Sequence, residues 1–172
     1  QGTTNLNRSG IIRIYNKNKV SKNILIMSPG IYSGGGTQTN LGYAIVRRDI
    51  DTEVWIWERR ANQLEDRRKF IKAIKENDPN IIYNLLEDGK LKLKKDSYYQ
   101  PSTEDISFVG YWGLNVQLGD LYNIVKLAKT KVECVILTGY YLGVSYVTNF
   151  LGNNFGTNDQ FEAGYTLVDK VI

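Results

Sequence analysis

The sequence predicts a three-layer α/β fold, with a mainly parallel sheet of about five or six strands between helices. Two observations carry this prediction. A continuous apolar run, typical of a strand buried on both faces, occurs at residues 23–27, and residues 132–137 form another stretch of the buried-strand type. Stretches with apolar residues at helical spacing alternate with the strands, as they do when helices connect parallel strands.

In the first half, the expected elements are strands at 11–15, 23–27 and 53–57 and helices at 40–48 and 63–76. The first strand is expected to be antiparallel and to lie at an edge of the sheet. Asn40 can cap the first helix. The apolar face of that helix would consist of Leu41, Ala44, Ile45 and Val46. The second helix would place Phe70, Ile71 and Ile74 at helical spacing and end before Pro79.

In the second half, the expected elements are helices at 81–86, 115–129 and 142–151 and strands at 132–137 and 165–168. A polar loop containing Pro101 separates the first two helices. No repeat, low-complexity tract or linker is visible, so we expect residues 1–172 to form one domain.

Composition excludes several kinds of site. The chain of 172 residues contains no histidine, so a Ser-His-Asp or Cys-His relay and a histidine-ligated zinc site cannot be completed within it. The single cysteine, Cys134, excludes an internal disulfide, and we expect it to be an inert core thiol. We therefore expect no metal and no cofactor.

Charge and hydropathy limit the partners. The net charge is +4, but basic and acidic residues alternate, as in the stretch 58–69, which is typical of solvated ion pairs and not of a nucleic-acid footprint. No apolar run approaches the roughly 20 residues of a membrane span. The chain begins at Gln1 and shows no signal peptide. We expect a soluble protein and leave its compartment open, with secretion after loss of a leader as one alternative.

A glycine-rich junction follows the strand at 23–27. Gly30 to Thr37 has the spacing of a phosphate-binding P-loop, but Gly36 stands at the lysine position, which argues against nucleotide binding. Glycines after a buried strand also suit half of an oxyanion hole, the loop whose amide stabilises a negatively charged oxygen. A plain glycine turn into a helix is the remaining alternative.

A second junction follows the strand at 132–137. Gly139 and Gly143 flank Tyr141 in the pattern strand, G-x-X-x-G, helix. This pattern is typical of a nucleophile elbow, a tight turn in which neighbouring side chains have no room. The central residue of the turn is here a tyrosine, not a serine.

These stretches together resemble the N-terminal portion of an α/β-hydrolase of the esterase/lipase type. Four stretches, in family order, carry the resemblance: Ile24–Gly30, Glu53–Asn62, Val135–Gly143 and Ala163–Asp169. The first resembles the strand that ends in the oxyanion loop, and the second resembles the next strand and its Asp-Arg-Arg-like turn. The third resembles the elbow with Gly-His-Ser-Leu-Gly, and the fourth resembles the strand after the elbow helix.

The resemblance implies roles for three residues. Tyr141 occupies the nucleophile position, and the backbone N–H groups of Leu142 and Ile31 would form the oxyanion hole. The sequence departs from the family where Tyr140, Tyr141 and Val144 replace histidine, serine and a small glycine. The family's later strands, which carry the acid and the histidine, and its cap are expected to be absent from this single α/β-hydrolase-like domain.

We therefore expect an α/β-hydrolase-like protein that is catalytically silent as this chain stands. The alternatives are an active ester or acyl hydrolase completed by a C-terminal half or carrying its native elbow, and a non-catalytic module that binds a ligand or partner or self-assembles. The corresponding partners are a small apolar or ester ligand, a second copy of this chain, or a complementing C-terminal chain.

Other polar candidates have structural interpretations. Ser145 is expected to be a hydroxyl on the surface of the helix after the elbow. Asp169 is expected to cap the end of the last strand. The tryptophans at 55, 57 and 112 are expected to be core or sheet-covering aromatics, although a ligand groove would also suit them.

Overall fold

The fold is described from a computed structural model, which defines residues 6–31, 33–84, 86–87, 90–91, 102–157 and 160–172. The residues gather in two compact units. The sheet unit comprises Gln1–Asn62 and Trp112–Ile172, and the second unit comprises Gln63–Tyr111.

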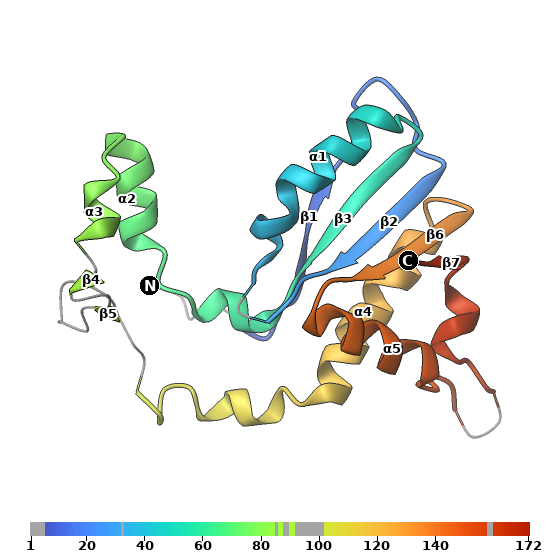
Figure 1. Ribbon diagram of the computed structural model, residues 1–172. Helices are drawn as coiled ribbons and strands as arrows, with labels where there is room; N and C mark the ends of the chain where they lie inside the picture. Colours follow the sequence, from blue (N-terminus) through green and yellow to red (C-terminus); the bar gives the residue numbers. More distant parts are fainter. Residues whose placement is uncertain (1–5, 32, 85, 88–89, 92–101, 158–159) are drawn as a thin grey trace. The chain divides into compact units, whose positions relative to one another are not determined.

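The sheet unit contains a five-stranded sheet in the order β1-β3-β2-β6-β7 (Figure 1). The strands are β1 (Gly10–Ile14), β2 (Asn23–Ser28), β3 (Thr52–Glu58), β6 (Cys134–Gly139) and β7 (Lys170–Val171). β1 is an antiparallel edge strand paired with β3, and all other pairs are parallel. The predicted fold class and the antiparallel edge strand are confirmed.

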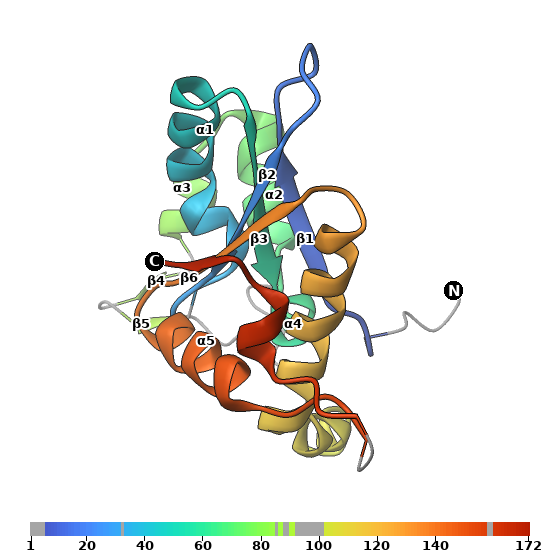
Figure 2. The same cartoon turned by 90° about the vertical axis from the view of Figure 1, so that its right-hand side faces the viewer.

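Helices cover both faces of the sheet. Figure 2 shows α1 (Thr39–Arg48) and α4 (Leu114–Lys129) on opposite sides of it. Ile24 and Ile26 of β2 pack with α4 and α5 (Leu142–Gly152), whereas Leu25 and Met27 pack with α1. The run at 23–27 is continuously apolar because successive side chains enter two different cores.

The apolar face predicted for the first helix is partly wrong. Leu41 and Ala44 are exposed, and α1 instead buries Gly42 and Val46. A Cβ at position 42 would lie 2.7 Å from Ile14 Cδ1, so the glycine lets the helix approach the sheet closely. The 3₁₀ turn η1 (Gly35–Gln38) directly precedes α1.

The last predicted strand, at 165–168, is wrong. Gly164–Leu167 forms the 3₁₀ turn η4, and the strand begins only at Lys170. The turn is fixed by packing, because a Cβ at Gly164 would lie 1.9 Å from the carbonyl oxygen of Phe150. Thr166 Oγ1 also donates to the carbonyl of Ala163, which stabilises the turn locally.

The described part of the second unit contains helices and one short hairpin. It contains α2 (Arg68–Glu76), α3 (Asn80–Tyr83), the short hairpin β4 (Leu86–Glu87) and β5 (Lys90–Leu91), and η3 (Ser107–Tyr111). The preceding turn, η2 (Arg60–Leu64), replaces the start of the helix predicted at 63–76.

Helix α2 begins late because the Asp66 carboxylate accepts hydrogen bonds from the backbone and side chain of Arg68 at its start. Its predicted stripe, Phe70, Ile71 and Ile74, is exposed, and Ala73 is the residue that it buries. The short helix expected at 81–86 ends at Tyr83, and the expected loop residue Pro101 lies outside the described residues. None of the described helices is both long and apolar enough to cross a membrane.

Candidate functional site

The turn between β6 and α5 holds Tyr141 in an unusual backbone conformation. Its φ is 53° and its ψ is −117°, and only Asn77 shares a positive φ among the described non-glycine residues. A tyrosine in this region of backbone space is strained by about 1–3 kcal/mol and persists only where the surrounding structure imposes it. The side chain of Tyr141 is 71% exposed, so burial of the phenol does not offset this strain.

Close packing around the two flanking glycines imposes the turn. A Cβ at Gly143 would lie 2.1 Å from the carbonyl oxygen of Ser28, at the end of β2. A Cβ at Gly139 would lie 2.5 Å from the backbone of Gly143. Both positions therefore require glycine, which is the physical reason for the G-x-X-x-G pattern in the sequence.

The glycine-rich loop after β2 lies against this turn. A Cβ at Gly30 would lie 3.2 Å from the Cβ of Tyr141 and 3.3 Å from Cδ1 of Tyr140. The backbone N–H of Tyr140 donates to the carbonyl of Ser28 at 3.0 Å. The parallel pairing of β2 with β6, which ends at Ser28 opposite Gly139, thus brings the two predicted junctions together.

Arg59 connects the same loop to the end of β3. Its Nη2 donates to the carbonyl oxygens of Gly30 at 2.8 Å and Ser33 at 3.0 Å. The guanidinium also lies 5.6 Å from the ring centroid of Tyr146 on α5. From the sequence, Arg59 was expected to form a solvent-exposed ion pair. The sequence did contain a signal that Arg59 positions the glycine-rich loop, because Arg59 directly follows a strand that ends at the same edge of the sheet as that loop.

Neither the amide of Ile31 nor that of Leu142 has a hydrogen-bond partner among the residues that the structure describes. Leu142 is the first residue of α5, where backbone N–H groups lack an intrahelical acceptor and the helix dipole is positive. These are the two amides that the resemblance assigns to an oxyanion hole.

The surface around the turn is apolar and aromatic. Ile31 is 39% exposed, and Tyr140 and Val144 are both more than half exposed. Ser145 is exposed on α5, as expected, and its carbonyl accepts a hydrogen bond from Asn149. The described residues at the turn thus offer phenol hydroxyls and backbone amides, and this part of the chain holds no histidine because the sequence contains none.

Asp169 lies away from the turn, beside the start of β6. Its carboxylate accepts hydrogen bonds from Lys129 Nζ and from the backbone N–H of Val135, both at 2.7 Å. Partial burial alone would raise the pKa of Asp169, but these donors hold it below its ordinary value. The carboxylate is used structurally, as expected, but it precedes the last strand, β7, and does not cap the end of that strand.

The remaining candidates are structural. Trp55, Trp57 and Trp112 are buried, as expected of core aromatics. Cys134 was expected in the core, but it is only half-buried at the first position of β6. Arg60 forms a two-fold ion pair with Asp120, with contacts of 2.7 and 2.8 Å, which raises the pKa of the arginine. Both side chains are largely buried, so this pair differs from the solvated pairs expected for the stretch 58–69.

No group of three histidine, cysteine, aspartate or glutamate side chains suited to a metal ion occurs within the described ranges. The phosphate contacts of a P-loop would require a lysine at position 36, where the chain has an exposed glycine. No family model matches the chain, and neither the curated proteins nor the solved structures compared with it gave a match.

Proposed function

We propose that this chain is an α/β-hydrolase-like protein of the esterase/lipase type that binds the oxygen of a small carbonyl or carboxylate ligand without hydrolysing esters. One observation carries the proposal: the strained backbone of Tyr141 places the unpartnered amide of Leu142 next to the loop that bears the unpartnered amide of Ile31. The strand order and directions, with an antiparallel edge strand, support the same resemblance.

The chemistry of the turn supports binding over turnover. A ligand oxygen that accepts hydrogen bonds from both amides would be held by preorganised donors, the arrangement that also stabilises an oxyanion. The apolar surroundings of Ile31 and Val144 suit a short acyl or aryl group. A tyrosine phenol acts as a nucleophile only when a base removes its proton, and the chain has no histidine to do so.

The binding part of the proposal is tested with butyrate as the probe. We expect addition of butyrate to shift the backbone amide resonances of Ile31 and Leu142 in nuclear magnetic resonance spectra. Leu142→Pro removes the N–H of one of the two donors, although it also restricts the backbone of Tyr141, whose ψ of −117° is not one that residues before proline favour. Leu142→Ala retains this N–H. The proline variant should lose binding and the alanine variant should keep it. Unshifted amides in the wild-type protein would contradict the proposal, whether or not the variants fold.

The absence of ester hydrolysis, the second part of the proposal, is tested with p-nitrophenyl butyrate. We expect no turnover above the rate in buffer, because neither a serine at the elbow nor a histidine base is present. Turnover that Tyr141→Phe abolishes would show that the phenol is a nucleophile. The chain would then be an active ester hydrolase, the competing function, and the description of it as silent would be wrong.

A further inference from the structure

A hollow with a volume of about 380 Å³ lies at the amino end of the parallel strands. Its walls come from the segment between β1 and β2, from the start of β3 and from the residues just before β6. The elbow lies at the opposite, carboxyl end of the same strands, where ligands of open α/β sheets ordinarily bind. The hollow is therefore independent of the site proposed above.

One wall of the hollow is held by a buried carboxylate. Glu53 is 3% exposed and accepts hydrogen bonds from Nε and Nη2 of Arg13 and from the indole N–H of Trp55. The guanidinium carbon of Arg13 lies 4.3 Å from the ring centroid of Tyr15. Arg13 is thus fixed between a carboxylate and an aromatic ring, and Glu53 is neutralised by a partner that also lines the hollow.

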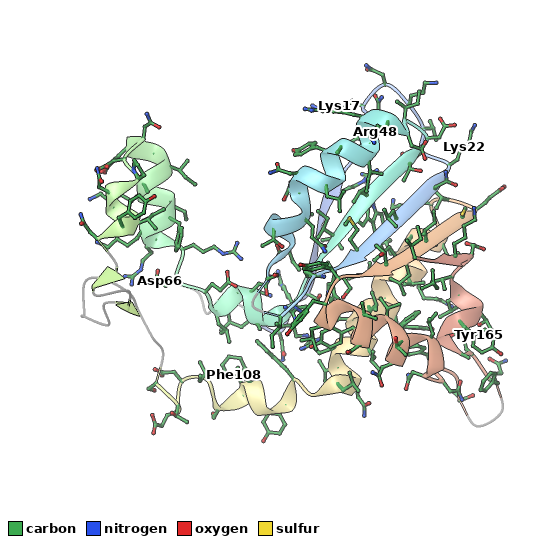
Figure 3. The ribbon with its side chains drawn as sticks, in the orientation of Figure 1. Lys17, Lys22, Arg48, Asp66, Phe108 and Tyr165 are labelled. Carbon is green, nitrogen blue, oxygen red and sulfur yellow. The ribbon has the colours of Figure 1, made fainter. Side chains whose placement is uncertain are left out.

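The three lysines of the hollow form no ion pair with the described residues, although Lys131 attracts Glu53 and Lys19 attracts Asp51 from beyond ion-pair distance. Lys17, Lys19 and Lys131 line the hollow, and the side chains of all three lack ion pairs and hydrogen bonds within the described part of the chain. Figure 3 shows Lys17 on the segment between β1 and β2, at this end of the sheet. By contrast, Lys22, Lys126 and Lys129 of the same unit each contact a carboxylate.

We propose that this hollow binds a small molecule that carries a diphosphate group. Once Glu53 and Arg13 neutralise each other, three lysine charges remain around a space of small-ligand size, for which about 300–1,000 Å³ is usual. A single carboxylate would compensate only one of them, whereas a diphosphate carries several negative charges close together. Lysine ammonium groups bind phosphate as compact point charges, whereas an arginine guanidinium binds it through two N–H groups in one plane.

Inorganic pyrophosphate is the probe, and isothermal titration calorimetry at low ionic strength is the measurement. The test variant is Lys17→Gln/Lys19→Gln/Lys131→Gln. The control variant, Lys69→Gln/Lys72→Gln/Lys75→Gln on α2, removes the same three charges from the second unit. We expect the test variant to bind at least about tenfold more weakly, since each lysine would contribute a fraction of the affinity. The control should bind as the wild type does.

Other outcomes overturn the proposal. Absence of pyrophosphate binding by the wild-type protein would do so, as would equal weakening in both variants, because the attraction would then reflect net charge alone. Binding of single-stranded oligonucleotides or anionic vesicles without binding of pyrophosphate would identify a macromolecular surface instead. All six lysines are on the surface, and a circular dichroism spectrum of each variant verifies that the fold is retained.

Discussion

At the carboxyl end of β2, β3 and β6, backbone groups form the candidate site, whereas at the amino end charged side chains line the hollow. The elbow depends on the conformation of Tyr141 and on glycines that leave no space for a Cβ. The hollow depends on Arg13, held by Glu53, and on lysines that project from loops.

This difference determines which amino-acid substitutions each end of the parallel strands can tolerate. Backbone groups packed within 3 Å of one another cannot adjust to an added methyl group, so a larger residue at Gly139 or Gly143 should destabilise the whole fold. Exposed ammonium groups can be replaced individually with little effect on folding, but their attraction for anions is screened by salt over about 10 Å at 0.1 M. Three predictions test this contrast.

The largest effect is expected for Gly143→Ala. The new Cβ would overlap the carbonyl oxygen of Ser28, so β2 or α5 must shift, and we expect the free energy of unfolding to fall by about 3 kcal/mol or more. Urea denaturation of the purified variant provides the measurement. Gly119→Ala in α4 is the matched control. No atom lies within 4 Å of that Cβ position, and alanine there should stabilise the helix by up to about 1 kcal/mol. Equal effects of the two substitutions would contradict the close packing.

A smaller effect is expected for Glu53→Gln at the amino end. Burial raises the pKa of Glu53, but hydrogen bonds from Arg13 and Trp55 outweigh it and hold the pKa below its ordinary value. The carboxylate therefore stabilises the fold above its unfolded pKa of about 4.3, and this stability is lost as the pH falls through the folded value. We expect Glu53→Gln to lower the free energy of unfolding by about 2 kcal/mol at neutral pH.

The pH dependence of this effect is the decisive measurement. The difference between wild type and Glu53→Gln in chemical denaturation should shrink as the pH falls below about 4. Glu133→Gln replaces an exposed carboxylate at the same end, which makes no ion pair in the described structure, and should change little at any pH. A difference that stays constant with pH would show that the charge of Glu53 is not the stabilising feature.

The smallest effect, and one of opposite sign, is expected for Tyr141→Gly. Glycine adopts a positive φ without strain and the tyrosine side chain is mostly exposed, so the variant should be more stable by about 1 kcal/mol in thermal or urea unfolding. Asn77→Gly is the control, because asparagine already tolerates its φ of 51° and ψ of 37°, and we expect a smaller gain. Destabilisation by Tyr141→Gly would contradict the assignment of strain to the elbow.

Local sequence signals predicted the elbow well, because its requirements are local. The start of α5 at Leu142 was expected from the glycines at 139 and 143, and the structure shows that both are sterically required. The strand predicted at 165–168 failed for the opposite reason. The contact between Gly164 and the carbonyl of Phe150 joins two elements in space and leaves no trace in hydrophobic periodicity.

The hollow could not be predicted in the same way. Lys17 and Lys19 lie in a turn, and Lys131 lies more than a hundred residues later, so their approach depends on the pairing of β2 with β6. The sequence also gives no sign that Glu53, in an apolar strand, accepts hydrogen bonds from Arg13 on a neighbouring strand. From the sequence, the scattered basic residues were therefore expected only to be exposed to solvent. The assignment of Tyr141, Ile31 and Leu142 to a site stays a prediction until ligand binding is measured.

The hydrogen bonds of Asn7 affect how much the length of the chain between Arg60 and Trp112 can vary. The side-chain oxygen of Asn7 accepts hydrogen bonds from Arg60 at 2.8 Å and from the indole of Trp112 at 2.9 Å. The places where the chain leaves and re-enters the sheet unit are thus joined through one amide. The entropy of closing the intervening loop grows only as the logarithm of its length, by about 0.6 kcal/mol per doubling. Segments of very different length can therefore be exchanged between these two anchors with little effect on the stability of the sheet.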